Sequence, residues 1–68
     1  KAYMPDVATS LYNLAYLYAG TQRLNEAETL YKKALEIYEQ LADKYPEVYQ
    51  NDLNMIQKEY QKLLNNMN

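Results

Sequence analysis

The chain contains neither cysteine nor histidine among its 68 residues. Without cysteine no disulfide can cross-link the fold, and without both residues the usual ligands of zinc are missing. The commonest catalytic base and the strongest nucleophile are missing as well. No glycine-rich phosphate loop and no paired acidic ligand motif takes their place. We therefore expect a protein that is not an enzyme, with no catalytic residues, no cofactor and no metal site.

Strong charge of one sign is absent too. Seven basic and nine acidic side chains give a formal net charge of -2, so nucleic acid is not an expected partner. No apolar run approaches the roughly 20 residues of a membrane span, and the first residues form no signal-peptide pattern. These absences predict a soluble, cytoplasmic protein without a membrane partner. Because the first residue is Lys1, we expect a fragment or a trimmed chain.

Glycine and proline are scarce, with one and two copies, while alanine, leucine, glutamate, lysine and glutamine are frequent, which favours helices over strands. Hydrophobic periodicity predicts three helices, over about residues 5–19, 25–43 and 46–65. Gly20 marks the end of the first helix, and Pro46 suits the first turn of the third. Because the connections are short, successive helices should lie antiparallel.

The start of the second helix has a capping signal, since Asn25 is followed three positions later by Glu28. Each predicted helix also carries an apolar stripe at helical spacing, with Lys33 and Ile37 away from the centre of the second stripe. The stripes, in chain order, are Val7, Leu11, Leu14, Ala15 and Tyr18; Ala27, Leu30, Tyr31, Ala34, Leu35, Tyr38 and Leu41; and Tyr49, Leu53, Ile56, Tyr60, Leu63 and Leu64. Five of the nine tyrosines lie on these stripes and are predicted to be core residues.

The small and large residues of the first two stripes resemble the tetratricopeptide repeat pattern, in the longer-period form found in kinesin light chains. The matching residues are Leu11, Leu14, Ala15, Tyr18, Ala27, Tyr31 and Ala34. The resemblance implies an all-α fold, with an antiparallel helix-turn-helix unit over residues 1–45 and a C-terminal capping helix over 46–68. Three of the small residues would let two helix backbones approach closely: Ala15, Ala27 and Ala34.

A weak internal repeat points to the capping role of the third helix. Three residues of the first segment recur at one common offset, Tyr3, Asp6 and Val7 as Tyr49, Asp52 and Leu53. At the same offset the small Ala15 corresponds to Gln61, a bulky polar residue. A solenoid ends in a unit with a polar outer face, so we expect the third helix to close the array.

In arrays of this family, the first helix of each pair lines a concave groove that binds peptides. The resemblance therefore implies a scaffold for protein–protein interaction, with a protein or peptide as partner. The implied binding residues are Thr9, Tyr12, Asn13 and Tyr16 on the first helix, with Lys58 and Lys62 on the third; Ala19, Glu59 and Asn65 accompany them. The alternative interpretation is that these side chains are solvated surface, and that the two lysines attract no acidic peptide.

A different hypothesis assigns the chain a structural role. No earlier repeat covers the first helix within this sequence, so its apolar face could drive self-association into a homo-oligomer or a helix-exchanged assembly. A self-associating or engineered repeat fragment would need no natural ligand. A free-standing three-helix bundle with an unrelated role is a further alternative, and Leu17 on the outer side of the first helix argues against it.

Overall fold

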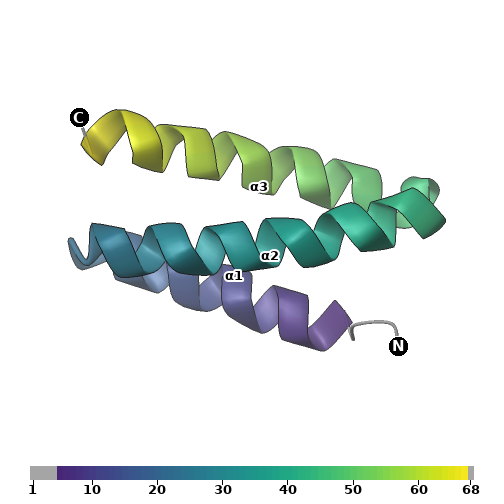
Figure 1. Cartoon of the computed structure of the whole chain (residues 1–68), viewed down its shortest axis with the longest axis horizontal. Helices are drawn as coiled ribbons and strands as arrows, with labels where there is room; N and C mark the ends of the chain where they lie inside the picture. Colours follow the sequence, from purple (N-terminus) through teal and green to yellow (C-terminus); the bar gives the residue numbers. More distant parts are fainter. Residues whose placement is uncertain (1–4, 68) are drawn as a thin grey trace.

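The computed structural model describes residues 5–67, which form three helices and no strand. They are α1 (Pro5–Gly20), α2 (Leu24–Lys44) and α3 (Pro46–Met67), and each runs antiparallel to the one before it (Figure 1). The all-α prediction is thereby confirmed. The outer ends of the predicted units 1–45 and 46–68, Tyr3 among them, lie outside the described residues.

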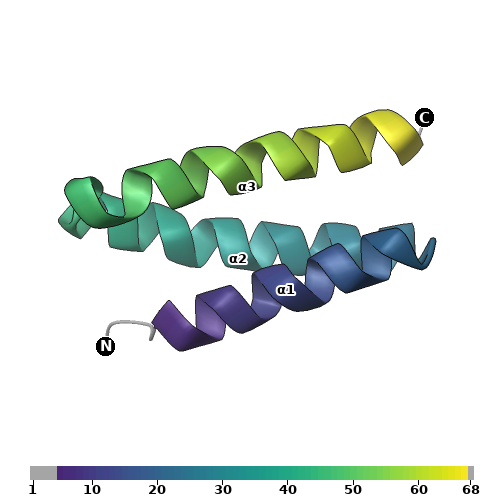
Figure 2. The ribbon, with the colours of Figure 1, turned by 180° about the vertical axis from the view of Figure 1, so that it is seen from behind.

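The middle helix, α2, organises the fold because it packs against both of the others. Seen from the opposite side, α1 and α3 flank α2, and their chains run in the same direction (Figure 2). Four alanines at the helix contacts have no exposed surface: Ala8, Ala15, Ala27 and Ala34. Side chains this small allow neighbouring helix backbones to approach closely. The largest fully buried side chains are Tyr31 and Ile56, from α2 and α3.

The buried surface of α2 is wider than the sequence stripe predicted. Ile37 is only 6% exposed and belongs to the core, although the sequence pattern placed it away from the centre of the stripe. Ala42 is buried as well. The reason is that α2 meets a helix on each of two sides, so apolar residues outside one central stripe also find neighbours.

The opposite error occurred on α1, where the sequence stripe overestimated burial. Val7 and Leu14 are 47% and 39% exposed, while the residues that follow them in sequence, Ala8 and Ala15, are completely buried. Since α1 packs mainly against α2, only one part of its apolar circumference is covered. The contact face is centred on Ala8 and Ala15, and the larger aliphatic side chains lie at its edge.

The predicted Asn25 cap is also wrong, because α2 begins one residue earlier, at Leu24, and the preceding Arg23 makes no side-chain cap. Instead, the Arg23 guanidinium donates two hydrogen bonds of 2.6 Å to the Glu26 carboxylate and lies 4.3 Å from the Tyr18 ring centre. The turn itself uses Gln22, whose φ of 67° lies in the left-handed region that usually favours glycine.

The second corner is tighter, with Tyr45 as the single residue between α2 and α3. The Tyr45 amide donates a 2.7 Å hydrogen bond to the Leu41 carbonyl, and Pro46 occupies the first position of α3, where its missing amide hydrogen costs nothing. This short connection holds α3 antiparallel to α2 and brings the rings of Tyr38 and Tyr49 into an edge-type contact, with 6.2 Å between their centres.

Candidate peptide-binding groove

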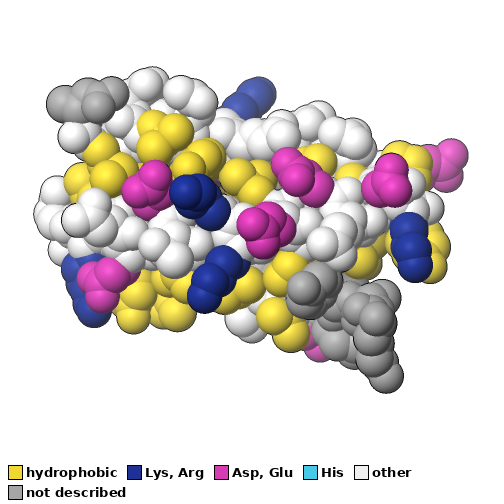
Figure 3. Space-filling model, in the orientation of Figure 1, with side chains coloured by type: hydrophobic (Ala, Val, Ile, Leu, Met, Phe, Trp, Pro, Cys, Tyr) yellow, Lys and Arg dark blue, Asp and Glu magenta, His cyan; other side chains and the backbone are white. Residues whose placement is uncertain are grey.

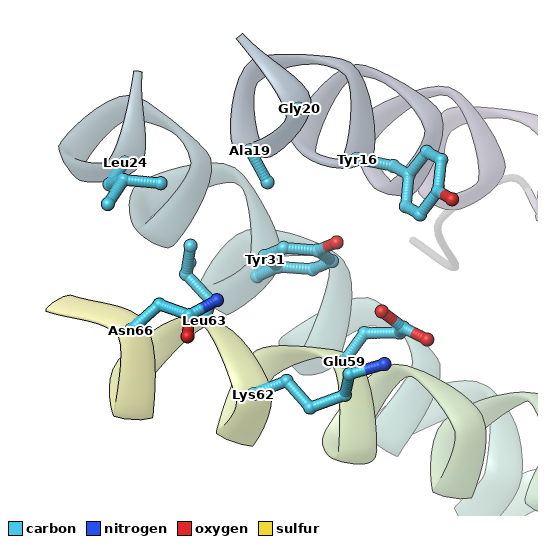
Figure 4. A pocket seen from close by; sticks show the side chains of 9 residues that line it. All are labelled: Tyr16, Ala19, Gly20, Leu24, Tyr31, Glu59, Lys62, Leu63 and Asn66. Atoms are coloured by element: carbon cyan, nitrogen blue, oxygen red, sulfur yellow. The ribbon is translucent and has the colours of Figure 1, made fainter. Parts of the chain in front are cut away.

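A groove runs between α1 and α3, above the N-terminal half of α2 (Figure 4). Its open volume is about 270 Å³. The lining residues come from all three helices: Tyr16, Ala19 and Gly20 of α1, Leu24 and Tyr31 of α2, and Glu59, Lys62, Leu63 and Asn66 of α3. Cofactor and drug-sized pockets usually measure about 300–1,000 Å³. The space here is suited to one or two side chains of a peptide.

A chain of tyrosine rings forms the aromatic part of the groove and of the core beneath it. The ring centres of Tyr16 and Tyr12 are 6.4 Å apart, those of Tyr12 and Tyr31 6.0 Å, and those of Tyr31 and Tyr60 6.3 Å. All three pairs are tilted, an arrangement that aromatic rings prefer to face-to-face stacking. The four rings therefore tie α1, α2 and α3 together behind the groove.

Burial and charge together change the acidity of two of these tyrosines. Removal from water raises the pKa of Tyr31 to about 12, with the negative charge of Glu59 as the next cause. Burial raises the pKa of Tyr12 too, and Glu59 again contributes. Because a carboxylate on α3 influences hydroxyls on α1 and α2, its electrostatic field extends across the groove.

The structure brings only some of the predicted binding residues together. Tyr16 and Lys62 line the groove on opposite walls, and Figure 4 shows both side chains at its rim. Tyr12 is half-buried behind Tyr16 and contacts Tyr31. Asn13 and Lys58 are exposed, and neither belongs to the lining. The Thr9 hydroxyl shares a 3.1 Å hydrogen bond with the Tyr38 hydroxyl.

Several lining residues were not proposed from the sequence as groove residues. Tyr31 was taken as core, which its 1% exposure confirms, yet it also forms the floor of the groove. On α3 the lining face contains Glu59, Lys62 and Asn66, which are three and four residues apart. This helical spacing was available in the sequence and would have selected Asn66 in place of Asn65.

A second apolar surface lies on the outer side of α1. Leu17 is 57% exposed, and with Val7 and Leu14 it adds to the aliphatic surface there. Two shallow hollows share Leu14. One is lined by Val7, Leu11 and Leu14 together with Asp6 and Ser10, and the other, at the junction with α2, by Leu14, Tyr18 and Leu30 together with Asn25, Glu26 and Thr29. Figure 3 shows hydrophobic side chains along the lower edge of the molecule, beneath the charged side chains of α2.

The described part of the chain contains neither a metal-binding cluster nor a membrane-spanning helix. No group of three or more acidic side chains there is placed to hold a metal ion. None of α1, α2 and α3 is both long enough and apolar enough to cross a membrane.

Comparison with known proteins identifies a family of helical repeats. The model of the tetratricopeptide repeat family matches residues 7–44, which span nearly all of α1 and the whole of α2. Neither the curated proteins nor the solved structures gave a match. Repeats of this family generally mediate protein–protein interactions by binding proteins or peptides, and they are generally non-catalytic. More than half of the sequence is covered by the family model, and the chain therefore belongs to the tetratricopeptide repeat family.

Proposed function

We propose that the chain is a protein-interaction module that binds a peptide segment of a partner in the groove between α1 and α3. The observation that carries the proposal is the lining itself, in which two parallel helices present side chains across a floor formed by Tyr31. Tyr16 is 61% exposed at the rim. A tyrosine in this position offers apolar area and a hydroxyl at little entropic cost, which is typical of residues that dominate binding energy.

The longer-period subtype and the capping role of α3 are part of the same proposal. In the common form of the repeat, a proline ends the second helix at the position that corresponds to Glu39. Here α2 continues to Lys44 and the proline is Pro46, which supports a longer repeat unit. Gln61 is exposed on α3, which suits a helix that ends an array in solvent. A cytoplasmic location stays a prediction from the sequence.

Two adjacent residues of α1 provide the test. Tyr16 and Leu17 are similarly exposed, at 61% and 57%, but only Tyr16 lines the groove. Peptides selected from a random displayed library on the immobilised chain would be titrated against Tyr16→Ala and Leu17→Ala. We expect Tyr16→Ala to weaken binding about tenfold or more, as at an interface hot spot, and Leu17→Ala to leave it unchanged. Equal affinities for both variants would refute the groove proposal.

Self-association is the second candidate function, and the exposure of Val7, Leu14 and Leu17 on α1 specifically favours it. Exposed aliphatic side chains that gather on one helix are typical of interaction sites. Sedimentation of the wild-type chain over a range of concentrations would reveal an oligomer, and Leu17→Ala would weaken it while Tyr16→Ala would not. A monomer at every concentration would remove this candidate. Such a fragment could also have been engineered, with no natural ligand.

A further inference from the structure

The charged and the aromatic side chains of the groove come from different helices. Both charged lining residues, Glu59 and Lys62, belong to α3, whereas the tyrosines Tyr16 and Tyr31 belong to α1 and α2. Figure 4 shows the Glu59 carboxylate directed toward the space beside the two rings. A ligand side chain in the groove would therefore meet ring surface on one side and a carboxylate on the other.

Glu59 is half-buried, and no hydrogen bond or ion pair within residues 5–67 engages its carboxylate. Its charge nevertheless contributes to the raised pKa of both Tyr12 and Tyr31. The faces of tyrosine rings carry negative electrostatic potential, and they attract cations within about 6 Å of the ring centre. The tyrosine ring faces and the Glu59 carboxylate therefore both favour a positively charged ligand group.

The ends of the helices act in the same direction. Because α1 and α3 are parallel, their C-terminal residues Gly20 and Asn66 line the same end of the groove. Each helix C-terminus carries roughly half a negative charge, and neither helix has a basic residue in its last turn to offset it. The N-terminus of α2, at Leu24, carries a partial positive charge that opposes them. Two negative helix ends therefore lie at this end of the groove against one positive end.

Lys62 is the cation in the lining, and it acts against a positively charged ligand. Its side chain is exposed and lies at the rim, as Figure 4 shows. A lysine on a flexible stem of four carbons can turn into solvent when another cation approaches. Glu59, in contrast, is held partly within the fold. We expect Lys62 to weaken the binding of a cation without preventing it.

From these observations we infer that the groove accepts a basic side chain, lysine or arginine, of the bound peptide, packed against the exposed ring of Tyr16 with its charge beside Glu59. The inference rests on the proposed function, because it names the chemistry of the peptide that the groove would bind. Acidic peptides, which Lys62 alone would favour, are the opposite outcome of the test.

Charge variants of α3 separate the two outcomes. The peptides selected from the random library would be titrated against the wild-type chain, Glu59→Gln and Lys62→Gln, with circular dichroism to verify that each variant is folded. For a peptide with a basic anchor, we expect Glu59→Gln to weaken binding about threefold and Lys62→Gln to tighten it. Replacing the anchor by norleucine, which keeps the apolar stem, should weaken binding about fivefold in the wild-type chain and less in Glu59→Gln.

The inference is overturned if peptides that depend on Tyr16 lack a basic residue, or if Lys62→Gln weakens them and Glu59→Gln does not. In that case the groove still binds peptides and the proposed function stands. If no selected peptide is sensitive to Tyr16→Ala, the proposed function itself fails, and the inference fails with it. Raising the salt concentration gives an independent measure, since the preference for the basic peptide over its norleucine analogue should decrease with screening.

Discussion

Tyr31 is the residue on which both the fold and the groove depend, and truncating it to alanine is the most informative perturbation. Its side chain is 1% exposed and sits between the rings of Tyr12 and Tyr60, which belong to the two outer helices. Tyr31→Ala would remove the floor of the groove and both aromatic contacts together. Tyr31→Phe is the matched control, because it keeps the ring and deletes only the hydroxyl.

The expected loss can be compared with the stability of a chain this small. Replacing a buried aromatic residue by alanine costs about 3–5 kcal/mol. The core of a chain of 68 residues rarely supplies more than about 3–5 kcal/mol. Tyr31→Ala should therefore leave the chain largely unfolded at 25 °C. Tyr31→Phe should cost less than about 1 kcal/mol, since no side chain of residues 5–67 hydrogen bonds to the lost hydroxyl.

Urea unfolding followed by circular dichroism at the helix band measures both variants. The wild-type chain and Tyr31→Phe should show cooperative transitions with similar midpoints, and Tyr31→Ala should show weak helicity without a clear transition. If Tyr31→Ala unfolded within about 1 kcal/mol of Tyr31→Phe, the ring would not hold the three helices together, and the assigned core would be wrong.

Three further predictions concern packing, hydrogen bonding and titration. Ala15→Leu should cost about 1–3 kcal/mol because Ala15 has no exposed surface, whereas Ser10→Leu, an exposed position on the same helix, should have little effect in thermal unfolding. Tyr38→Phe should cost about 0.5–1.5 kcal/mol in urea by removing the hydrogen bond to Thr9, and in a Thr9→Val background it should cost less. The pKa of Tyr31 is about 12 in the fold and about 10 in the unfolded chain, so the unfolded state releases its proton first. The free energy of unfolding should be unaffected by this group below pH 10 and should decrease as the pH rises from about 10 to about 12. Urea unfolding at several pH values would measure this decrease, which should be smaller in Tyr31→Phe.

The sequence contained enough information for the fold class. The spacing of apolar residues identified three helices, and Pro46 identified the start of the third, because proline restricts the backbone regardless of tertiary contacts. The small residues of the repeat pattern were also informative: Ala15, Ala27 and Ala34 are all fully buried. These features are local or follow helical geometry, so a single sequence is sufficient to detect them.

What the sequence could not provide was the side from which each helix is covered. Leu14 lies on the predicted stripe of its helix and Ile37 lies away from the centre of its own, yet Leu14 is 39% exposed and Ile37 only 6%. The difference arises from the number of neighbours, since α2 has two and α1 mainly one. The predicted N-cap at Asn25 was wrong for a related reason. The hydrogen-bonded side chains of Arg23 and Glu26 occupy the corner at which Asn25 was expected to cap α2.

Groove residues were the hardest to predict, since a groove depends on where two helices that are not adjacent in sequence face each other. The expected position of Tyr16 agrees with its place in the lining, but that agreement does not establish binding. On α3, Lys58 and Asn65 are the sequence neighbours of the lining residues Glu59 and Asn66, but neither of them lines the groove. A rotation of one residue on a helix, about 100°, is enough to move a side chain out of a groove.

The most direct test of the proposed groove is to map a bound peptide by nitrogen–proton NMR correlation spectra of the labelled chain, titrated with a peptide selected from the random library. We expect the largest shifts at Ala19, Gly20 and Lys62, on the two facing helices. Shifts concentrated instead at Val7, Leu14 and Leu17 would place the interaction on the outer surface of α1 and contradict the groove.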